Sequence, residues 1–582
     1  MSYSSIKALL LKRFHLPKER SVRRAVRSFS LAEKTVFYVF VLLFIFSGTA
    51  LIWKVNSSFL VEVPSRGGTL VEGIVGNPRF INPTLALSEA DKSLSALIYS
   101  GLISKNHLGE IENNLAEEIS TESNGLTYTA RLKEGVKFHD GVEITADDII
   151  FTIQKIQDPN IKSPLFGDWS GVAVEKIDER TVRFSLKQPY APFLNNLSLG
   201  ILPRHIWRNV RTDEFAFSQF NTLPVGSGPY KINNVERNSG GIPDYYDLVP
   251  NNEAPRIPYI SHIIFKFYAS EKDLLEAFRK GDIDSLSGIA SDQAELLKKS
   301  GAQIHSSPLP RVFGVFFNQN QNKVLLDKTV RSALNISAPK EEIVETVLHG
   351  FGTVIDGPLP PGTLGEEVVS SLARESRLES AAALLSKSGW ARNPQTGVLE
   401  KKSGKVIVTL SFSISTGNVP ELRAVAEKLR DTWTALGAQV EVQVYETGEL
   451  NQTVIRPRKF DALLFGEVVG RDADLYPFWH SSQRIDPGLN IALYANSRAD
   501  KFLEDVRKTT DPALRRSSYT AFQQEIKNDV PAVFLYAPNF IYVLPEKVKG
   551  VDLGELSTSQ DRFAGVLDWY IDTDSVWKIF NK

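Results

Sequence analysis

The chain contains no cysteine, one methionine and eight scattered histidines among its 582 residues. The missing thiols exclude disulfides, iron-sulfur clusters, thiolate zinc sites, cysteine nucleophiles and a lipid anchor on a cysteine. The sequence also lacks an H-E-x-x-H zinc motif and a G-x-S-x-G nucleophile elbow. No cofactor is expected, and no catalytic or metal-ligating residues are predicted.

Neither sign of charge dominates, with 67 basic and 68 acidic side chains. Residues 1–54 hold ten of the basic groups and two of the acidic ones, so the rest of the chain carries a net charge of −9. A mildly acidic body is a poor match for nucleic acid and is compatible with cationic or zwitterionic ligands. Nucleic acid is therefore not expected as a partner.

One long apolar run is present, Thr35–Trp53, with 19 residues and no charge. A helix of this length can cross a hydrocarbon core of about 30 Å. Nine basic residues precede it, which predicts a cytoplasmic N-terminus, a single-pass anchor in the cell membrane and an extracytoplasmic body. A cleaved signal peptide, with Gly48 and Ala50 as small residues, is the alternative; the run exceeds the usual apolar length of about 7 to 15 residues.

Residues 125–157 predict a compact module. Apolar residues alternate with polar ones over 126–132, which indicates a strand with one buried face. A turn and a short returning strand at 136–138 are expected next. Thr145 and Asp148 then form a capping box at the start of a helix. Within the module, His139 and Asp140 have no third ligand or nucleophile nearby, so a hydrogen-bonded turn is favoured over a catalytic pair.

The amino-acid sequence of this module, GLTYTARLKEGVKFHDGVEITADDIIFTI, resembles the signature segment of the family 5 solute-binding proteins, the dipeptide and oligopeptide receptors of ABC importers. Further similar stretches are PVGSGPYKI at 224–232, residues 328–344 and residues 460–480, and the resemblance spans nearly all of 69–582. It implies an α/β, two-lobed periplasmic-binding-protein-like fold of type II, in the large peptide-receptor subclass with an extra subdomain. Here one N-terminal transmembrane helix precedes that fold.

The resemblance also implies a division of the chain and a set of partners. A monomeric receptor, not an enzyme, would close on its solute and dock on permease subunits, with ATPase subunits acting indirectly. The expected parts are a cytoplasmic basic segment (1–34), the transmembrane helix (35–53), a linker (54–68), lobe I (69–103, 223–310 and 531–582), a subdomain inserted in lobe I (104–222) and lobe II (311–530).

Two local patterns support an α/β second lobe. Strands at 406–412 and 439–445 flank a helix at 421–436, which is a βαβ-like order. Residues 328–350 predict two helices, with Ser337 as the cap of the second.

A ligand site is expected in residues 460–480. Ala462–Phe465 predicts a buried strand, and acidic and aromatic groups cluster past its carboxyl end, where ligands bind in α/β lobes. Three carboxylates compete to hold a peptide's α-ammonium, and solvated loop charges are the alternative. The expected ligand contacts are Glu467, Asp472, Asp474, Phe465, Gly466, Tyr476 and Trp479, joined by Ser88 and Glu89, whose segment offers backbone groups in the resembled family.

Three other functions stay open at this point. A receptor for a non-peptide solute, such as a sugar, an opine or a metal complex, would have the same fold; scarce histidine and absent cysteine count against nickel. An extracytoplasmic hydrolase is the enzyme alternative, since fold does not fix function. A tethered adhesion or signalling module is the third.

Overall fold

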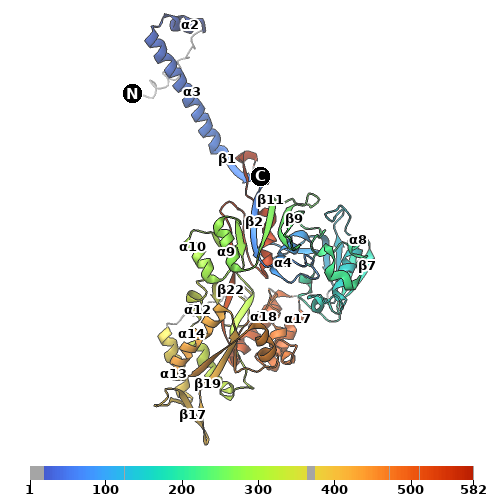
Figure 1. Cartoon of the computed structure of the whole chain (residues 1–582), viewed down its shortest axis with the longest axis vertical. Helices are drawn as coiled ribbons and strands as arrows, with labels where there is room; N and C mark the ends of the chain where they lie inside the picture. Colours follow the sequence, from blue (N-terminus) through green and yellow to red (C-terminus); the bar gives the residue numbers. More distant parts are fainter. Residues whose placement is uncertain (1–18, 123–124, 364–373, 471, 510, 581–582) are drawn as a thin grey trace, which may run out of the picture. The chain divides into compact units, whose positions relative to one another are not determined.

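The computed structural model describes residues 19–122, 125–363, 374–470, 472–509 and 511–580 (Figure 1). It divides into two compact units, one made of residues up to Ser65 with those from Thr573, the other of Arg66–Asp572. Residues 1–18 of the predicted basic segment lie outside the described residues.

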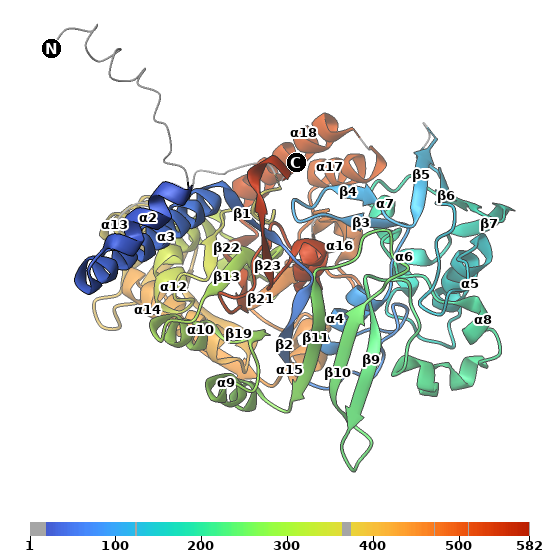
Figure 2. The ribbon, with the colours of Figure 1, turned by 90° about the horizontal axis from the view of Figure 1, so that it is seen from above.

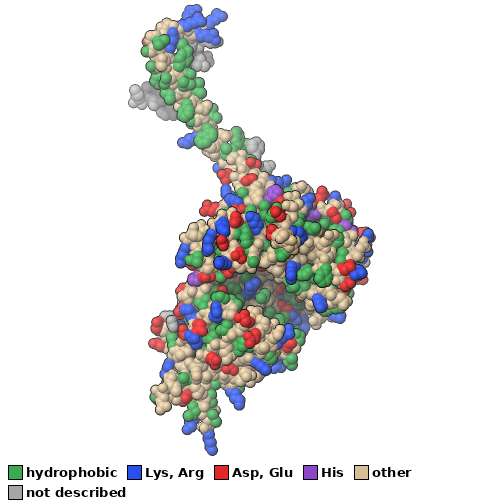
Figure 3. All heavy atoms as spheres, in the orientation of Figure 1, with side chains coloured by type: hydrophobic (Ala, Val, Ile, Leu, Met, Phe, Trp, Pro, Cys, Tyr) green, Lys and Arg blue, Asp and Glu red, His purple; other side chains and the backbone are tan. Residues whose placement is uncertain are grey.

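The first unit is built around a long apolar helix. Its elements are α2 (Glu19–Ser28), α3 (Leu31–Phe59), β1 (Leu60–Pro64), β23 (Thr573–Trp577) and the 3-10 turn η7 (Lys578–Phe580). Ser30 caps α3, because its hydroxyl accepts a hydrogen bond from the Glu33 amide at 3.4 Å; the Glu33 carboxylate accepts in return from the Ser30 amide at 2.7 Å. Apolar side chains cover α3, which is long and apolar enough to span a membrane, a test that an N-terminal signal sequence also passes (Figure 3).

The second unit contains a twelve-stranded mixed sheet. Its main path runs β20, β19, β21, β14, β22, β12, β2, β11, β10, β9, and β13 and β15 pair with β22. Figure 2 shows β2, β11, β10 and β9 side by side. The strands are β2 (Gly67–Val75), β9 (Tyr230–Arg237), β10 (Pro243–Pro250), β11 (Ile260–Tyr268), β12 (Ser285–Ser287), β13 (Ile304–Pro308), β14 (Arg311–Phe317), β15 (Gly352–Val354), β19 (Ser411–Gly417), β20 (Gln439–Tyr445), β21 (Ala462–Val468) and β22 (Ala532–Val543).

The twelve residues of β22 join the two halves of this sheet. Its early residues pair with β14 and β15, and its later residues with β12 and β13. We call β2 and β9–β13 the first half, and β14, β15 and β19–β21 the second half. Parallel and antiparallel pairs both occur, which confirms the expected α/β class. The predicted lobe boundaries stay a prediction.

Helices cover the faces of both halves. The first half carries α4 (Glu89–Ile98), α9 (Glu271–Lys280) and α10 (Ser291–Lys299); the second carries α11 (Lys328–Ser337), α12 (Lys340–Thr346), α13 (Arg374–Lys387), α14 (Pro420–Leu436), α17 (Ser497–Lys508) and α18 (Pro512–Asp529). On α14 the apolar stripe of Val425, Leu429 and Trp433 is fully buried, as its helical spacing predicts. Gly437 ends α14 in a left-handed conformation at φ 114°.

A separate four-stranded antiparallel sheet holds the predicted module. Its strands are β5 (Ala116–Thr121), β6 (Thr127–Leu132), β7 (Ala173–Asp178) and β8 (Thr181–Ser185), and α5 (Ala146–Gln157) packs on them. The capping box is confirmed, since the Asp148 carboxylate accepts from the Thr145 amide at 2.9 Å. The predicted hairpin partner at 136–138 is wrong: β5 and β8 already fill both edges of β6, and Lys137 forms an isolated bridge with Glu143.

His139 joins this module to the turn at Gly226–Gly228. Its Nε2 lies 3.1 Å from the Gly228 oxygen, and its Nδ1 accepts from the Gly226 amide at 3.3 Å. Burial lowers the pKa of His139 to about 4. A Cβ on Gly226 would lie 2.0 Å from the Ile98 oxygen, so this close approach requires glycine. The arrangement matches the hydrogen-bonded turn inferred from the sequence.

The predicted βαβ order is confirmed, since β19 and β20 pair in parallel and α14 connects them, but two details of the sequence predictions in the second half are wrong. Residues 406–412 form two strands: β18 (Val406–Thr409) joins β16 (Trp390–Arg392) and β17 (Leu399–Ser403) in a small sheet, and β19 starts at Ser411 beside β20. Val406 and Ile407 of β18 are exposed, whereas Leu410, between the two strands, is fully buried. Ser337 does not cap α12; its hydroxyl donates to the Ala333 oxygen at 2.8 Å within α11.

Candidate functional site

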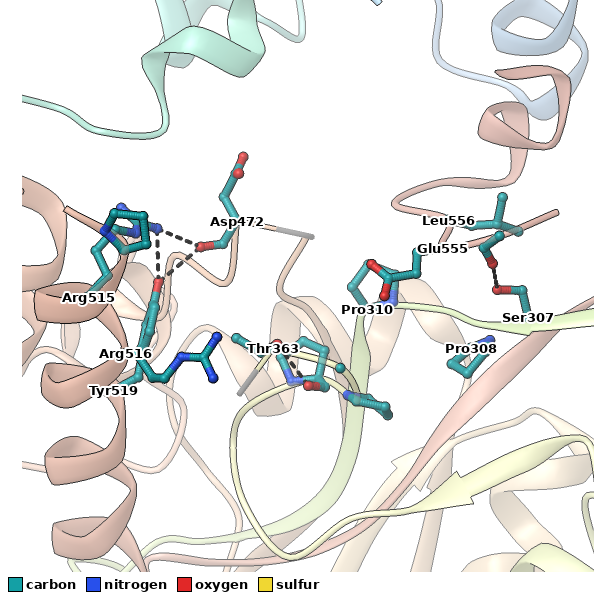
Figure 4. A pocket seen from close by; sticks show the side chains of 15 residues that line it. Ser307, Pro308, Pro310, Thr363, Asp472, Arg515, Arg516, Tyr519, Glu555 and Leu556 are labelled. Atoms are coloured by element: carbon teal, nitrogen blue, oxygen red, sulfur yellow. Dashed lines mark hydrogen bonds between the residues drawn. The ribbon is translucent and has the colours of Figure 1, made fainter. Parts of the chain in front are cut away.

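A cavity of about 620 Å³ lies where the connection from β13 to β14 approaches α18. Figure 3 shows the surface hollowed between the two halves, and Figure 4 shows the cavity from close by. It is lined by Ser307, Pro308, Pro310, Pro360, Pro361, Gly362, Thr363, Asp472, Pro512, Arg515, Arg516, Tyr519, Gly554, Glu555 and Leu556. Segments that are far apart in the sequence therefore meet at one site.

The cavity carries charges of both signs. Asp472 and Glu555 are its acidic residues, and Arg515 and Arg516 come from the first turn of α18. Arg515 is held in place by the backbone oxygens of Val506 and Asp472, at 3.1 and 3.2 Å. Across the described residues, the Arg516 guanidinium has no hydrogen bond or ion pair, and Figure 4 shows it directed toward Thr363. Sequence reasoning missed both arginines, because nothing in the pattern of a helix start marks them.

Asp472 is the one predicted ligand contact that lines the cavity. Its Oδ1 accepts from the Asn195 side-chain amide at 2.6 Å, and among the described residues its Oδ2 has no hydrogen-bond partner. Burial raises the pKa of Asp472, while Lys105 and Arg515 favour the ionised form. Its backbone oxygen accepts from the Tyr519 hydroxyl at 2.9 Å, so α18 fixes the loop that holds it.

Asp474 and Tyr476 are engaged elsewhere. The Asp474 carboxylate accepts from the Arg507 Nε at 2.9 Å and from the Tyr190 hydroxyl at 3.5 Å. The same guanidinium stacks on the Tyr476 ring at 4.0 Å. The Ala191 amide also donates to the Arg507 backbone oxygen at 3.0 Å. The structure thus uses Asp474 and Tyr476 to join residues 190–191 to α17, outside the cavity lining.

Glu467 lies inside the second half and is 3% exposed. It is on β21 opposite Val312 of β14 and does not line the cavity. Neither of its carboxylate oxygens has a hydrogen-bond partner within the described ranges. Burial raises the pKa of Glu467 well above its usual value. Burial therefore favours the protonated form of this carboxyl group.

Phe465, Gly466 and Trp479 belong to the core around β21. Phe465 is half-buried and packs on the apolar cluster that contains Trp479. A Cβ on Gly466 would lie 2.5 Å from the Phe313 ring, so any larger residue at this position would clash with that ring. Trp479 is fully buried, and its indole packs at 6.0 Å from the Phe316 ring. All three lie outside the cavity lining.

Ser88 and Glu89 begin α4, also apart from the cavity lining. The Ser88 hydroxyl accepts from the Asp91 amide at 3.1 Å and so caps the helix. The Glu89 carboxylate accepts from the fully buried Arg562 at 3.0 Å. Arg562 also donates from its Nε to the buried Glu72 at 3.1 Å. The Glu89 side chain is therefore part of an ion-pair network with the buried Arg562 and Glu72.

The described residues contain no group of three or more histidines or carboxylates that could hold a metal ion. In the cavity, Asp472 and the arginines of α18 can supply hydrogen bonds and charge to a ligand.

Comparison with known proteins adds independent findings. Residues 110–485 match the family described as "Bacterial extracellular solute-binding proteins, family 5 Middle". The oligopeptide-binding protein AppA of Bacillus subtilis is 30% identical over 503 residues, which is 84% of this chain and 89% of that protein.

Solved structures are similar over most of the chain. The Bacillus subtilis AppA structure in complex with a nonapeptide has a TM-score of 0.64 and 28% identity, covering 88% of this chain and all of that one. The Campylobacter jejuni NikZ structure in complex with Ni(L-His) has a TM-score of 0.66 and 25% identity, covering 86% and 99%. Because the family match takes in well over half of the chain, this protein belongs to family 5 of the bacterial extracellular solute-binding proteins.

Proposed function

We propose that this chain is a membrane-anchored, extracytoplasmic receptor of an ABC importer that binds short peptides and delivers them unchanged to the permease. The cavity of about 620 Å³, lined from distant segments and charged with both signs, carries the proposal. The similarity to an oligopeptide-binding protein and to its nonapeptide complex supports a peptide as the ligand.

The charges of the cavity suit a zwitterion. The free oxygen of Asp472 would accept hydrogen bonds from a peptide's α-ammonium, and the guanidinium of Arg516 would bind a carboxylate of the same ligand. Backbone groups of Pro360–Thr363 and Gly554–Leu556 would pair with the ligand's main chain. A neutral sugar would leave both charges without a counterpart. This is why a peptide fits better than an uncharged solute.

Closure would use the contacts between residues 190–195 and the loop at 472–474. Asn195 bonds Asp472, and Tyr190 bonds Asp474 beside Arg507. A ligand shifts a conformational equilibrium only by binding one state better than the other. These contacts would exist in the closed state, and the peptide would add its own contacts to that state.

A thermal-shift titration of the full chain in detergent tests the ligand class. Dipeptides and oligopeptides are compared with sugars, an opine and a nickel-histidine complex. A specific ligand present at 100 times its Kd stabilises the folded state by about 2.7 kcal/mol, so the shift grows with concentration. A response to sugars or the nickel complex, without one to peptides, would refute peptide binding.

The Asp472→Asn variant locates the site. Loss of a charge-assisted hydrogen bond costs about 1.5 to 3 kcal/mol, which corresponds to a roughly tenfold to hundredfold weaker peptide Kd. Asp244→Asn, at an exposed position on β10, is the matched control and keeps the affinity. Equal affinity in both variants would remove Asp472 from the site. Turnover of the peptides by the purified chain would instead indicate a hydrolase.

A further inference from the structure

The first unit holds a second segment beside α3. β1 and β23 pair antiparallel over five residues, with Leu60 opposite Trp577 and Pro64 opposite Thr573. Since β1 leaves the end of α3, the antiparallel register makes β23 run back toward that helix. The indole Nε1 of Trp577 donates to the Asn56 side-chain oxygen of α3 at 2.9 Å. The chain therefore returns to the helix from more than 500 residues away.

The level of this contact follows from helix geometry. Asn56 lies three residues beyond Trp53, the last residue of the apolar run, and at 1.5 Å per residue this is about 4 to 5 Å. A bilayer adds roughly 5 to 7 Å of headgroup region on each side of its hydrocarbon core. With the apolar run in the core, the Trp577 indole lies within the headgroup region. That is the depth at which tryptophan is enriched in membrane proteins.

The neighbouring side chains have the character of a membrane interface. Val55, Phe59, Trp577 and Ile579 are 49%, 55%, 47% and 69% exposed, so four large apolar side chains near the β1–β23 pair lie at the surface of the described residues. Lys54 and Lys578 are exposed next to them, where anionic phosphates attract cations. The acidic residue of β23, Asp574, lies at the other end of the strand.

We infer that residues Trp577–Ile579 form a second membrane contact, inserted into the interfacial region of the lipid bilayer beside α3. The inference rests on the proposed membrane anchor and deepens it: the carboxy-terminal strand docks on the emerging helix, and its aromatic and aliphatic side chains bind lipid.

Site-specific labelling of the full chain in phosphatidylcholine and phosphatidylglycerol vesicles tests the contact. Because the chain has no cysteine, Ile579→Cys and Asp574→Cys each give one labelling site for an environment-sensitive nitrobenzoxadiazole dye. The two positions differ by five residues, and Asp574 lies toward the membrane-distal end of β23. The label of Ile579→Cys should be quenched by doxyl lipids and protected from iodide, and the label of Asp574→Cys should show the reverse. Adding Trp577→Ala should reduce the lipid quenching at position 579.

Two controls separate the possible failures. The double variant Glu62→Cys with Ser575→Cys, which places cysteines at facing positions, should form a disulfide on oxidation if β1 and β23 pair in solution. Extraction with alkaline carbonate reports the anchor itself. If the protein resists extraction and iodide quenches both labels equally, the second contact is refuted and the anchor stands. If carbonate releases the protein, the anchor and the second contact both fail.

Discussion

The stability of the second unit should fall as the pH drops from 7 to 5, and His139 should account for a measurable part of the loss. The ring lies between Gly226 and Gly228, and burial lowers its pKa from 6.5 to about 4. The unfolded chain therefore binds a proton near pH 6.5, which the folded chain does not bind until about pH 4. The stability contributed by neutral His139 is fully present above pH 7 and is lost as the pH falls from 6.5 to about 4.

The size of the loss follows from linkage. With pKa values of 6.5 and about 4, about 2 kcal/mol should be lost between pH 7 and pH 5, and about 3 kcal/mol by pH 4. His139→Gln removes the titrating group and keeps a polar side chain at the turn. The difference in unfolding free energy between the two proteins should therefore shrink by these amounts as the pH falls.

Urea unfolding of both proteins at several pH values measures this difference, and titrations shared by both proteins cancel. A flat difference for His139→Gln between pH 7 and pH 5 would refute the claim that this imidazole is buried neutral.

Two further perturbations address buried charge. Arg562→Met leaves the buried Glu72 without its cation and should lower the free energy of unfolding in urea by about 3 to 5 kcal/mol. Adding Glu72→Gln should restore part of the lost stability. If the double variant recovers no stability, the broken ion pair is not the cause of the loss. Burial raises the folded pKa of Glu467, so its stabilising effect is present at low pH and lost as the pH rises. The thermal midpoint of Glu467→Gln, relative to that of the unchanged protein, should be higher at pH 8 than at pH 5. An equal difference between the two midpoints at both pH values would contradict this.

The sequence predicted structure well where the stabilising interactions join residues that are close in the sequence. Capping at Thr145 depends on a neighbour three residues along the chain, and the structure confirms it. The apolar stripe of α14 also has a period that is visible without any partner. Pairing across the chain was harder, as the hairpin proposed for β6 shows, since its true neighbours were two other strands of the same segment.

The candidate site was only partly predictable for the same reason. Three carboxylates within eight residues look alike in sequence, yet Glu467 is buried in the core, Asp474 pairs with Arg507, and Asp472 alone lines the cavity. Strand register and contacts with distant segments made that distinction. Arg516, some forty residues away, could not be assigned to the site before the fold brought α18 to it.

The continuity of β22 sets a limit on how this sequence can vary. Tyr536 stacks on Phe313 in one half, and six residues later Tyr542 donates to Glu72 in the other at 2.6 Å. Side chains alternate between faces along a strand, so gaining or losing one residue between these tyrosines would point Tyr542 away from Glu72. Relatives that keep both contacts should have an invariant spacing here, while insertions accumulate in the surface loops.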